Sequence, residues 1–314
     1  MNKKIDIIVP CYNEEEVLHE TSGRLLKLME EMISNNMINQ ESFIVFVDDG
    51  SADSTWKIIE ELSEKEYHFK GIKLSRNKGH QNALLAGLHT TQADAAISID
   101  ADLQDDINAI KEMVVQYNEG FDVVYGVRNK REKDSFLKRF TAQNYYKVLK
   151  LMGVNIVYDH ADYRLLSRPV LDSLKDYKEV NVFLRGIIPM IGYSSTKVYY
   201  ERDKRFAGES KYSVKKMISF AWDGISSLSI APLRIITSLG FIIFLASFAI
   251  TIWILFIRFF TDNAMPGWAS TTLPIYFLGG IQLLSIGIVG EYVGKIYMET
   301  KRRPRYVIEK IIKK

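Results

Sequence analysis

Short apolar runs alternate with segments of helical spacing over the first 120 residues of the chain. Ile5–Pro10 is a β-rich run that ends at a proline, and residues 14–32 then carry apolar side chains at helical intervals. The same order of strand and helix recurs from residues 43–47, 72–74 and 95–99. Four such units predict an α/β fold with a mostly parallel sheet and helices on both faces. Ligands bind such sheets at the carboxyl ends of the strands.

The C-terminal third has a different pattern. Residues 235–257 form an uncharged run, long enough as a helix to cross a hydrocarbon core of roughly 30 Å. A second uncharged run, residues 264–290, begins with a turn-prone segment. We predict two transmembrane helices with a short outer loop over residues 234–298, with two buried core helices as the alternative. Residues 213–233 have an apolar stripe flanked by lysines, which predicts an amphipathic juxtamembrane helix.

Charge distribution adds an orientation to this picture. The chain of 314 residues has a net charge of +3, which argues against a strongly basic nucleic-acid binder. Residues 295–314 carry eight basic and two acidic side chains, so the other 294 residues have a net charge of −3. By the positive-inside rule, both ends of a multi-pass protein with this pattern are cytoplasmic. We therefore predict a cytoplasmic domain over residues 1–212 and a basic cytoplasmic tail over residues 299–314.

Three polar motifs follow the predicted strands. They are VPCYNEE at residues 9–15, DDGSADST at residues 48–55 and DADLQD at residues 100–105. Asp100 and Asp102 alternate along the chain, so an extended backbone points both carboxylates to one side. Such oxygen ligands suit Mg²⁺ or Mn²⁺, which bind diphosphates through their remaining coordination positions. Solvated turn carboxylates are the alternative for any one of these motifs alone.

In this order and spacing, the motifs resemble the nucleotide-sugar-binding GT-A domain of family 2 glycosyltransferases, over about residues 1–230. DYRLL at residues 162–166, RFAGESKY at residues 205–212 and the two apolar runs bring the resemblance closest to the polyprenyl-phosphate glycosyltransferases. That group includes the bactoprenol glucosyltransferases and the dolichol-phosphate mannosyltransferases. The resemblance implies an inverting enzyme of the plasma membrane that transfers a sugar from a UDP-sugar to undecaprenyl phosphate. It also implies a homo-oligomer, such as a tetramer.

The resemblance assigns donor-side roles to residues of the motifs. The base and ribose would contact Pro10, Tyr12, Asn13 and Glu14, and the uracil would also contact Val47 and Asp49. Asp100 and Ala101 would approach the ribose and phosphates, Asp102 and Gln104 would bind the metal, and Arg205 and Lys211 would close over the diphosphate. Glu14 is alternatively a helix first-turn carboxylate. The two basic residues are alternatively part of a loop near anionic lipid.

The acceptor side is assigned in the same way. Arg128 matches the arginine that binds the acceptor phosphate, and Arg139 is a second contact or, alternatively, a residue attracted to lipid headgroups. Asp162 matches the acidic residue at the reaction centre, although Tyr163 replaces the phenylalanine of that family segment. The predicted catalytic residues are therefore Asp102, Asp162 and Arg128. We interpret His80 and Cys11 as loop residues rather than catalysts.

Other functions share parts of this pattern. A processive polysaccharide synthase would have a Gln-x-x-Arg-Trp motif and further membrane spans, which the sequence lacks. A membrane-anchored nucleotide-binding regulator without catalysis would not need acceptor-side groups, and a dinucleotide oxidoreductase would need a G-x-G-x-x-G after the first strand. The motifs do not specify the donor sugar. We favour glucose, with N-acetylglucosamine second.

Overall fold

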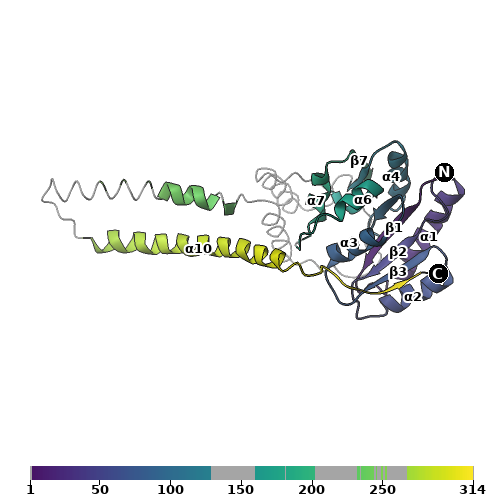
Figure 1. Cartoon of the computed structure of the whole chain (residues 1–314), viewed down its shortest axis with the longest axis horizontal. Helices are drawn as coiled ribbons and strands as arrows, with labels where there is room; N and C mark the ends of the chain where they lie inside the picture. Colours follow the sequence, from purple (N-terminus) through teal and green to yellow (C-terminus); the bar gives the residue numbers. More distant parts are fainter. Residues whose placement is uncertain are drawn as a thin grey trace.

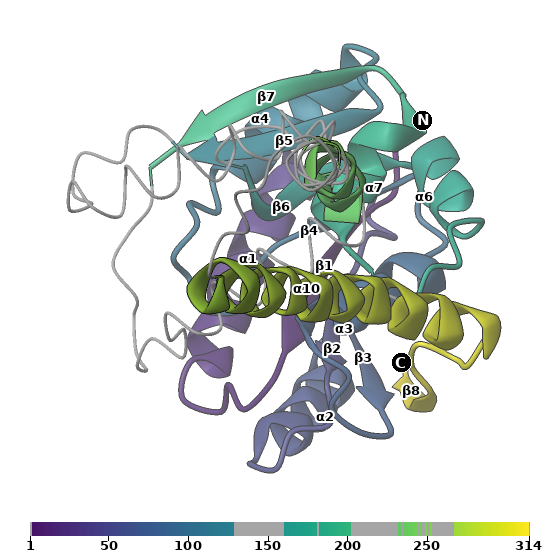
Figure 2. The same ribbon diagram turned by 90° about the vertical axis from the view of Figure 1, so that its left-hand side faces the viewer.

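The chain folds around a sheet whose strands follow the order β7-β5-β6-β4-β1-β2-β3-β8 (Figure 2). The computed structural model describes residues 2–128, 160–180, 182–201 and 267–313, with parts of the segment from 232 to 252. Its strands are β1 (Ile5–Cys11), β2 (Ile44–Asp48), β3 (Phe69–Leu74), β4 (Ala95–Ser98), β5 (Val123–Arg128), β6 (His160–Ser167), β7 (Ser195–Tyr200) and β8 (Ile308–Ile312). Its helices are α1 (Leu18–Ser34), α2 (Thr55–Lys65), α3 (His80–Thr90), α4 (Ala109–Asn118), α6 (Arg168–Leu174), α7 (Leu184–Ile191) and α10 (Trp268–Thr300).

The directions of the strands place the site. β1 pairs in parallel with β2 and β4, β2 with β3, and β5 with β7. β6 runs antiparallel to both β4 and β5. The predicted mostly parallel sheet is therefore confirmed. The carboxyl ends of β1, β2, β4, β5 and β7 and the amino end of β6 all lie at one edge of the sheet.

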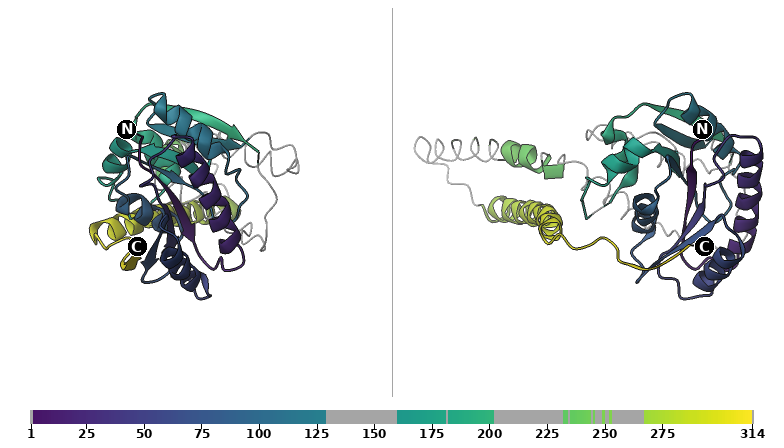
Figure 3. Two further views of the ribbon diagram at one scale, coloured as in Figure 1. Left: turned by 90° about the vertical axis from the view of Figure 1, so that its right-hand side faces the viewer. Right: turned by 45° about the vertical axis from the view of Figure 1, so that its right-hand side comes forward.

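Two layers of helices cover the sheet, because side chains of the strands alternate between its faces. Ile7 of β1 packs into a core with α1, α2 and α4, whereas Ile8 packs into a second core with α3, α6 and α7. The helices α1 and α3 lie on opposite sides of the sheet (Figure 3). Gly87 allows α3 to approach closely, since a Cβ at this position would stand 2.3 Å from Ile8 Cγ2.

The end of the basic tail is a strand of this sheet, which the sequence analysis did not predict. β8 pairs antiparallel with β3, with Ile311 opposite Ile72. Ion pairs at 3.1 Å from Lys73 to Glu309 and at 2.8 Å from Lys310 to Glu60 support the pairing. Residues 308–312 therefore cover the outer edge of β3, where its N–H and C=O groups would otherwise lack partners.

The long helix α10 extends away from the sheet (Figure 1). It exposes large apolar side chains along its length, including Leu283, Leu284 and Ile286. In the part of the chain that the structure describes, no helix is both long enough and apolar enough to span a membrane. Most of the predicted juxtamembrane helix and first span, residues 213–257, lies outside the described residues. The membrane pair over residues 234–298 therefore stays a prediction.

The segment between α10 and β8 contacts α3 through His89, whose Nδ1 lies 3.1 Å from the Tyr306 hydroxyl. Burial, together with the positive charges of Arg305 and Lys175, lowers the pKa of His89 to about 4. A histidine in an unfolded chain has a pKa of about 6.5, so between these values the unfolded state binds the proton more readily. The stability that depends on neutral His89 is fully present above pH 6.5 and is lost as the pH falls toward 4.

We therefore expect His89→Gln to flatten the fall in Tm between pH 6.5 and pH 4.5. The measurement is the thermal unfolding of the purified chain across this range, with His19→Gln as the control because His19 is an exposed histidine of α1. An unchanged pH slope in folded His89→Gln would contradict the assignment.

Candidate active site

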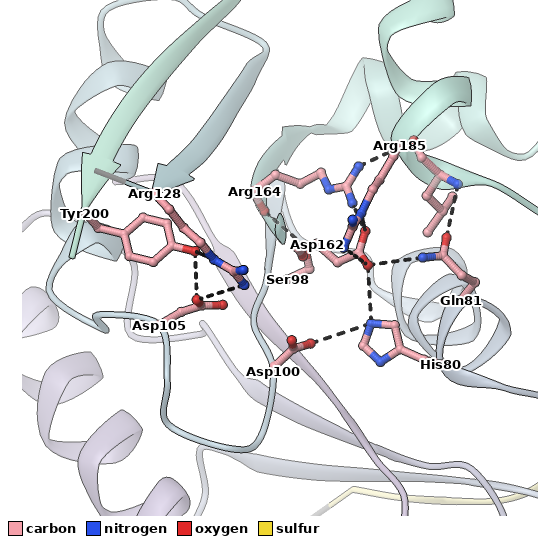
Figure 4. Close-up of polar contacts among 11 residues, drawn as sticks. His80, Gln81, Ser98, Asp100, Asp105, Arg128, Asp162, Arg164, Arg185 and Tyr200 are labelled. Carbon is pink, nitrogen blue, oxygen red and sulfur yellow. Dashed lines mark hydrogen bonds and ion pairs between the residues drawn. The ribbon is translucent and has the colours of Figure 1, made fainter. Parts of the chain in front are cut away.

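Charged side chains gather at the edge of the sheet where the parallel strands end, in two neighbouring groups (Figure 4). One group surrounds Asp162 near the start of β6, and the other surrounds Asp105 in the loop after β4. We call them the Asp162 group and the Asp105 group. The resemblance implies that Asp100, Asp102, Asp162 and Arg128 act in one site, and the structure has all four at this edge.

Arginine and glutamine side chains surround the carboxylate of Asp162. Arg164 on the same strand donates to Oδ1. Arg185 of α7 approaches from a second direction, with Nε 3.3 Å from Oδ1 and Nη2 3.2 Å from Oδ2. Gln81 of α3 donates to Oδ2 at 3.1 Å and accepts the backbone N–H of Leu184 through its own carbonyl oxygen. Asp162 thus joins β6, α3 and α7.

These contacts determine the charge of Asp162. Burial alone would raise its pKa, since only 7% of the residue is exposed. The charges of Arg185, Arg164 and His80 outweigh that effect and hold the pKa well below its usual range. Asp162 is therefore ionised at neutral pH, and both of its oxygens already accept hydrogen bonds. Such a carboxylate suits the orientation of cations better than the uptake of a proton.

His80 links Asp162 to the acidic loop. Its Nε2 lies 3.7 Å from Asp162 Oδ2 and 3.6 Å from Asp100 Oδ1. His80 is the first residue of α3, directly after the loop, and not a loop residue as the sequence analysis predicts. Burial raises the pKa of Asp100, the neighbouring carboxylates of Asp105, Asp162 and Asp102 raise it further, and His80 opposes the shift. Asp100, Asp102 and Asp105 therefore place three acidic side chains close together in the loop after β4.

A divalent cation fits this concentration of charge. Among the described residues, no three His, Cys, Asp or Glu side chains converge as a metal cage. Mg²⁺ usually binds one or two carboxylates together with substrate phosphates, so Asp100 and Asp102 suit a metal that arrives with a diphosphate. Leu103, the next residue, has a φ of +55°. A branched side chain is strained in this region, and such strain is concentrated at functional sites.

Gln104 is nearly buried, and its backbone N–H donates to Asp102 Oδ1 at 3.2 Å. This bond closes a tight turn in which the side chain of Asp102 is held close to its own loop. Ala101 is also buried, and its carbonyl oxygen accepts the hydroxyl of Thr21 at 2.7 Å. Metal binding by Gln104 and substrate contact by Ala101 stay predictions.

The Asp105 group contains the predicted acceptor-side arginine. Arg128 Nη2 lies 3.5 Å from Asp105 Oδ1, and Arg128 Nε donates to the Tyr200 hydroxyl at 3.4 Å. The Tyr200 hydroxyl donates to Asp105 Oδ1 at 2.7 Å. β5, β7 and the loop after β4 therefore meet at a single buried carboxylate.

The loops after β1 and β2 are joined by hydrogen bonds. The Asn13 side chain accepts the N–H of Ala52 at 2.9 Å, and the Glu14 N–H donates to the hydroxyl of Thr55 at 2.8 Å. Asn13 has a φ of +54°, a conformation that asparagine tolerates. Tyr12 is exposed beside it, with 40% of its surface accessible. The predicted nucleotide-binding residues Tyr12, Asn13 and Glu14 thus lie on a well-defined loop at the correct edge.

Other predicted contacts of the nucleotide are buried. Pro10 lies within β1 and pairs with Val47, which has no exposed surface. Asp49 accepts the backbone N–H groups of Lys78 and Gly79 at 2.7 and 2.8 Å, which holds the loop before α3. Burial raises its pKa, and these two bonds oppose the shift. Uracil contact by these residues stays a prediction. Arg139, Arg205 and Lys211 lie outside the described residues.

Sequence reasoning missed several members of the two groups. Gln81 and Arg185 come from helices that are 81 and 23 residues away from Asp162 in the chain. Asp105 was part of a recognised motif but received no role, and Tyr200 received none. Arg164, an arginine among the apolar residues of DYRLL, is the signal that could have pointed to a charge network. An arginine in a buried strand needs partners of opposite charge.

Ligands of α/β proteins bind at the carboxyl ends of the strands, so the charged side chains gathered at this edge define a candidate ligand site. Residues 6–175 match glycosyl transferase family 2. The chain is 49% identical over 307 residues to a Bacillus subtilis protein named uncharacterized glycosyltransferase YkoT, covering 97% of this chain and 91% of that one. The chain belongs to glycosyl transferase family 2, and it is a glycosyltransferase.

Other relatives carry more specific names. The chain is 38% identical over 311 residues to the prophage bactoprenol glucosyl transferase homolog of Escherichia coli, covering 99% of this chain and 100% of that one. It is also 38% identical over 307 residues to the bactoprenol glucosyl transferase of Shigella phage SfX, covering 98% of this chain and 99% of that one. The likeness therefore continues well beyond the region that matches the family.

Proposed function

We propose that this enzyme transfers a sugar from a UDP-sugar to undecaprenyl phosphate at the cytoplasmic face of the plasma membrane, with inversion at the anomeric carbon. Glucose is the favoured sugar and N-acetylglucosamine the second. The observation that carries the proposal is the nearly full-length likeness to proteins named bactoprenol glucosyl transferase, which includes the region after residue 175. The product would be a lipid-linked sugar for modification of cell-envelope glycans.

The donor side of the proposal rests on the acidic loop after β4. Asp102 and Gln104 would hold Mg²⁺ or Mn²⁺, with the carboxylate of Asp100 in the same loop, and the metal would neutralise charge on the departing UDP. Tyr12, Asn13 and Glu14 would contact the nucleoside from the loop after β1, and Arg205 and Lys211 would contact the diphosphate. The strained turn at Leu103 supports this role, because it keeps the carboxylate of Asp102 in one place.

The acceptor side needs little proton transfer. A phosphate monoester has a second pKa of about 6, so a polyprenyl phosphate is largely a dianion at neutral pH and can attack the sugar carbon directly. One direct displacement inverts that carbon. Asp162, which is ionised and already hydrogen-bonded, fits this mechanism as the residue that orients Arg185. Arg128 would position the phosphate of the lipid.

A lipid acceptor requires contact with the bilayer. The exposed leucine and isoleucine side chains of α10 and the basic residues that follow it support a membrane-anchored enzyme with two transmembrane helices and cytoplasmic termini. The backbone N–H of Val180 donates to Glu299 at 2.7 Å, which ties α10 to the loop between α6 and α7. We propose that several copies assemble, as a tetramer, through the membrane segments.

A panel of sugar nucleotides tests the proposal. Purified enzyme in detergent is given undecaprenyl phosphate and each UDP-sugar in turn, and the lipid product is identified by mass spectrometry. We expect one lipid-phosphate-linked hexose, with UDP-glucose turned over at least about tenfold faster than UDP-N-acetylglucosamine, a discrimination of about 1.4 kcal/mol. UDP release that does not depend on the lipid phosphate would contradict the acceptor assignment. A growing polymer would indicate a processive synthase.

A further inference from the structure

Arg128 ends β5 with its guanidinium against Asp105 and Tyr200, and neither residue has a role in the donor chemistry described above. Asp105 and Tyr200 are 5% and 3% exposed, whereas 26% of the Arg128 side chain is accessible. Asp105 and Tyr200 therefore contact the side of the guanidinium that faces the protein interior. The exposed part of the Arg128 side chain is available to a ligand.

Aromatic rings fix the pair in place. The rings of Tyr200 and Tyr163 meet edge to face with their centroids 5.2 Å apart, and Tyr163 is 1% exposed. The Tyr163 hydroxyl donates to the backbone carbonyl of Asp106 at 2.9 Å, next to Asp105. β6, β7 and the loop after β4 are thereby locked together, so the Asp105 carboxylate has little freedom to move.

Electrostatics favour a fixed, charged arginine. Burial would lower the pKa of Arg128, but the nearby Asp105 carboxylate and the Tyr200 hydroxyl raise it above its ordinary value. A buried carboxylate without a cation partner is costly, so Asp105 and Arg128 are held together. Asp105 also belongs to the loop that carries Asp100 and Asp102. One loop therefore connects the acidic donor side with the arginine.

We propose that Asp105 and Tyr200 are positioning residues, which hold the Arg128 guanidinium in the orientation that receives the phosphate of the acceptor. This inference rests on the proposed function, in which the acceptor is a lipid phosphate. Asp105 acts through Arg128 and does not touch the substrate. Tyr200 supports both by donating to the carboxylate and accepting from the arginine.

Steady-state kinetics of the full-length enzyme test this with Asp105→Asn, Tyr200→Phe and Arg128→Gln. We expect Asp105→Asn to raise the KM for undecaprenyl phosphate about tenfold, with the KM for the UDP-sugar unchanged, because misplacement of a positioning group weakens only its own substrate contact. Tyr200→Phe keeps the ring against Tyr163 and should raise the acceptor KM by a smaller factor. Tyr199→Phe is the matched control, since Tyr199 is 57% exposed on the same strand.

The double variant Asp105→Asn with Arg128→Gln distinguishes positioning from general damage. If Asp105 acts through Arg128, the double variant has the acceptor KM of Arg128→Gln alone. The inference would be overturned if the increases in acceptor KM of the two single variants multiplied in the double variant. It would also be overturned if folded Asp105→Asn and Tyr200→Phe both kept the acceptor KM of the parental enzyme. A lower acceptor KM in Asp105→Asn would also overturn it, because the carboxylate would then be a competitor of the phosphate.

The same experiment separates this inference from the proposed function. If Arg128→Gln leaves the acceptor KM unchanged, the acceptor role of Arg128 is wrong and the proposed function fails at that residue. If Arg128→Gln raises the acceptor KM while Asp105→Asn and Tyr200→Phe do not, the proposed function stands and the positioning role alone fails. Circular dichroism and calorimetric binding of UDP confirm that each variant is folded.

Discussion

Asp102→Ala is expected to reduce sugar transfer on the order of 1,000-fold, because a metal that stabilises a departing diphosphate contributes several kcal/mol and each 1.4 kcal/mol is a factor of ten. The residue lies in the acidic loop after β4, where its Oδ1 accepts the N–H of Gln104. Its loss would leave Gln104 as the remaining member of the predicted metal pair, with the carboxylate of Asp100 in the same loop.

The cause can be measured apart from activity. Calorimetric titration of UDP with and without Mn²⁺ should show that the metal strengthens binding to the parental enzyme and has a much smaller effect on Asp102→Ala. Asp106→Asn is the control from the same loop, since an asparagine oxygen can still accept the N–H of Asn108. Transfer at the parental rate by folded Asp102→Ala would show that Asp102 holds no essential metal.

The first half of the fold could be predicted because its strands are short apolar runs that end in turns or polar motifs. β1, β2 and β4 begin within one residue of the predicted positions, and β3 begins three residues earlier than predicted. β7 and β8 have a weaker pattern. Both are edge strands of the described sheet, and residues such as Lys197 and Glu309 face solvent. An edge strand has a neighbouring strand on only one side, so it is less buried and needs fewer apolar residues. Its sequence therefore resembles that of a loop.

The site was predictable to the extent that it lies in contiguous motifs. Asp100, Asp102, Asp162 and Arg128 follow from the resemblance. Figure 4 shows Asp100, Asp162 and Arg128 at one edge of the sheet, and Asp102 lies in the loop after β4 at the same edge. Their partners were not predictable. Arg185 meets Asp162 only because α7 packs beside β6, and Tyr200 meets Asp105 only because β7 pairs with β5. Such long-range contacts depend on tertiary packing, which one sequence does not display.

Asp162→Asn is expected to be the most damaging substitution for stability and to reduce transfer about 100-fold as well. Arg164 is 1% exposed and would lose its carboxylate partner. A broken buried ion pair costs about 3–5 kcal/mol, mainly through the charge left behind. Arg185 would lose one of its two acceptor oxygens and the negative charge beside it, and the misplacement of a group by about 1 Å can cost 100-fold in rate.

A second variant separates the two effects. Asp162→Asn combined with Arg164→Met removes the buried positive charge along with the negative one, so we expect the Tm to recover much of its loss while transfer stays low. Lys175→Met is the control, because it removes an exposed cation away from the site. Gln81→Glu is unsuitable for this purpose, since it would add a charge beside Asp162. Full recovery of transfer in the double variant would show that Asp162 serves stability alone.

The pH dependence gives an independent test of the ionised carboxylate. The folded pKa of Asp162 is depressed well below the unfolded value of about 3.9, so its stabilising contribution is present above that value and is lost only as the pH falls through the folded pKa. Between pH 7 and pH 5 the parental enzyme should therefore show no inflection in kcat from this residue. An activity loss near pH 6 that disappears in a weakly active Asp162→Asn variant would instead assign Asp162 a proton-transfer role.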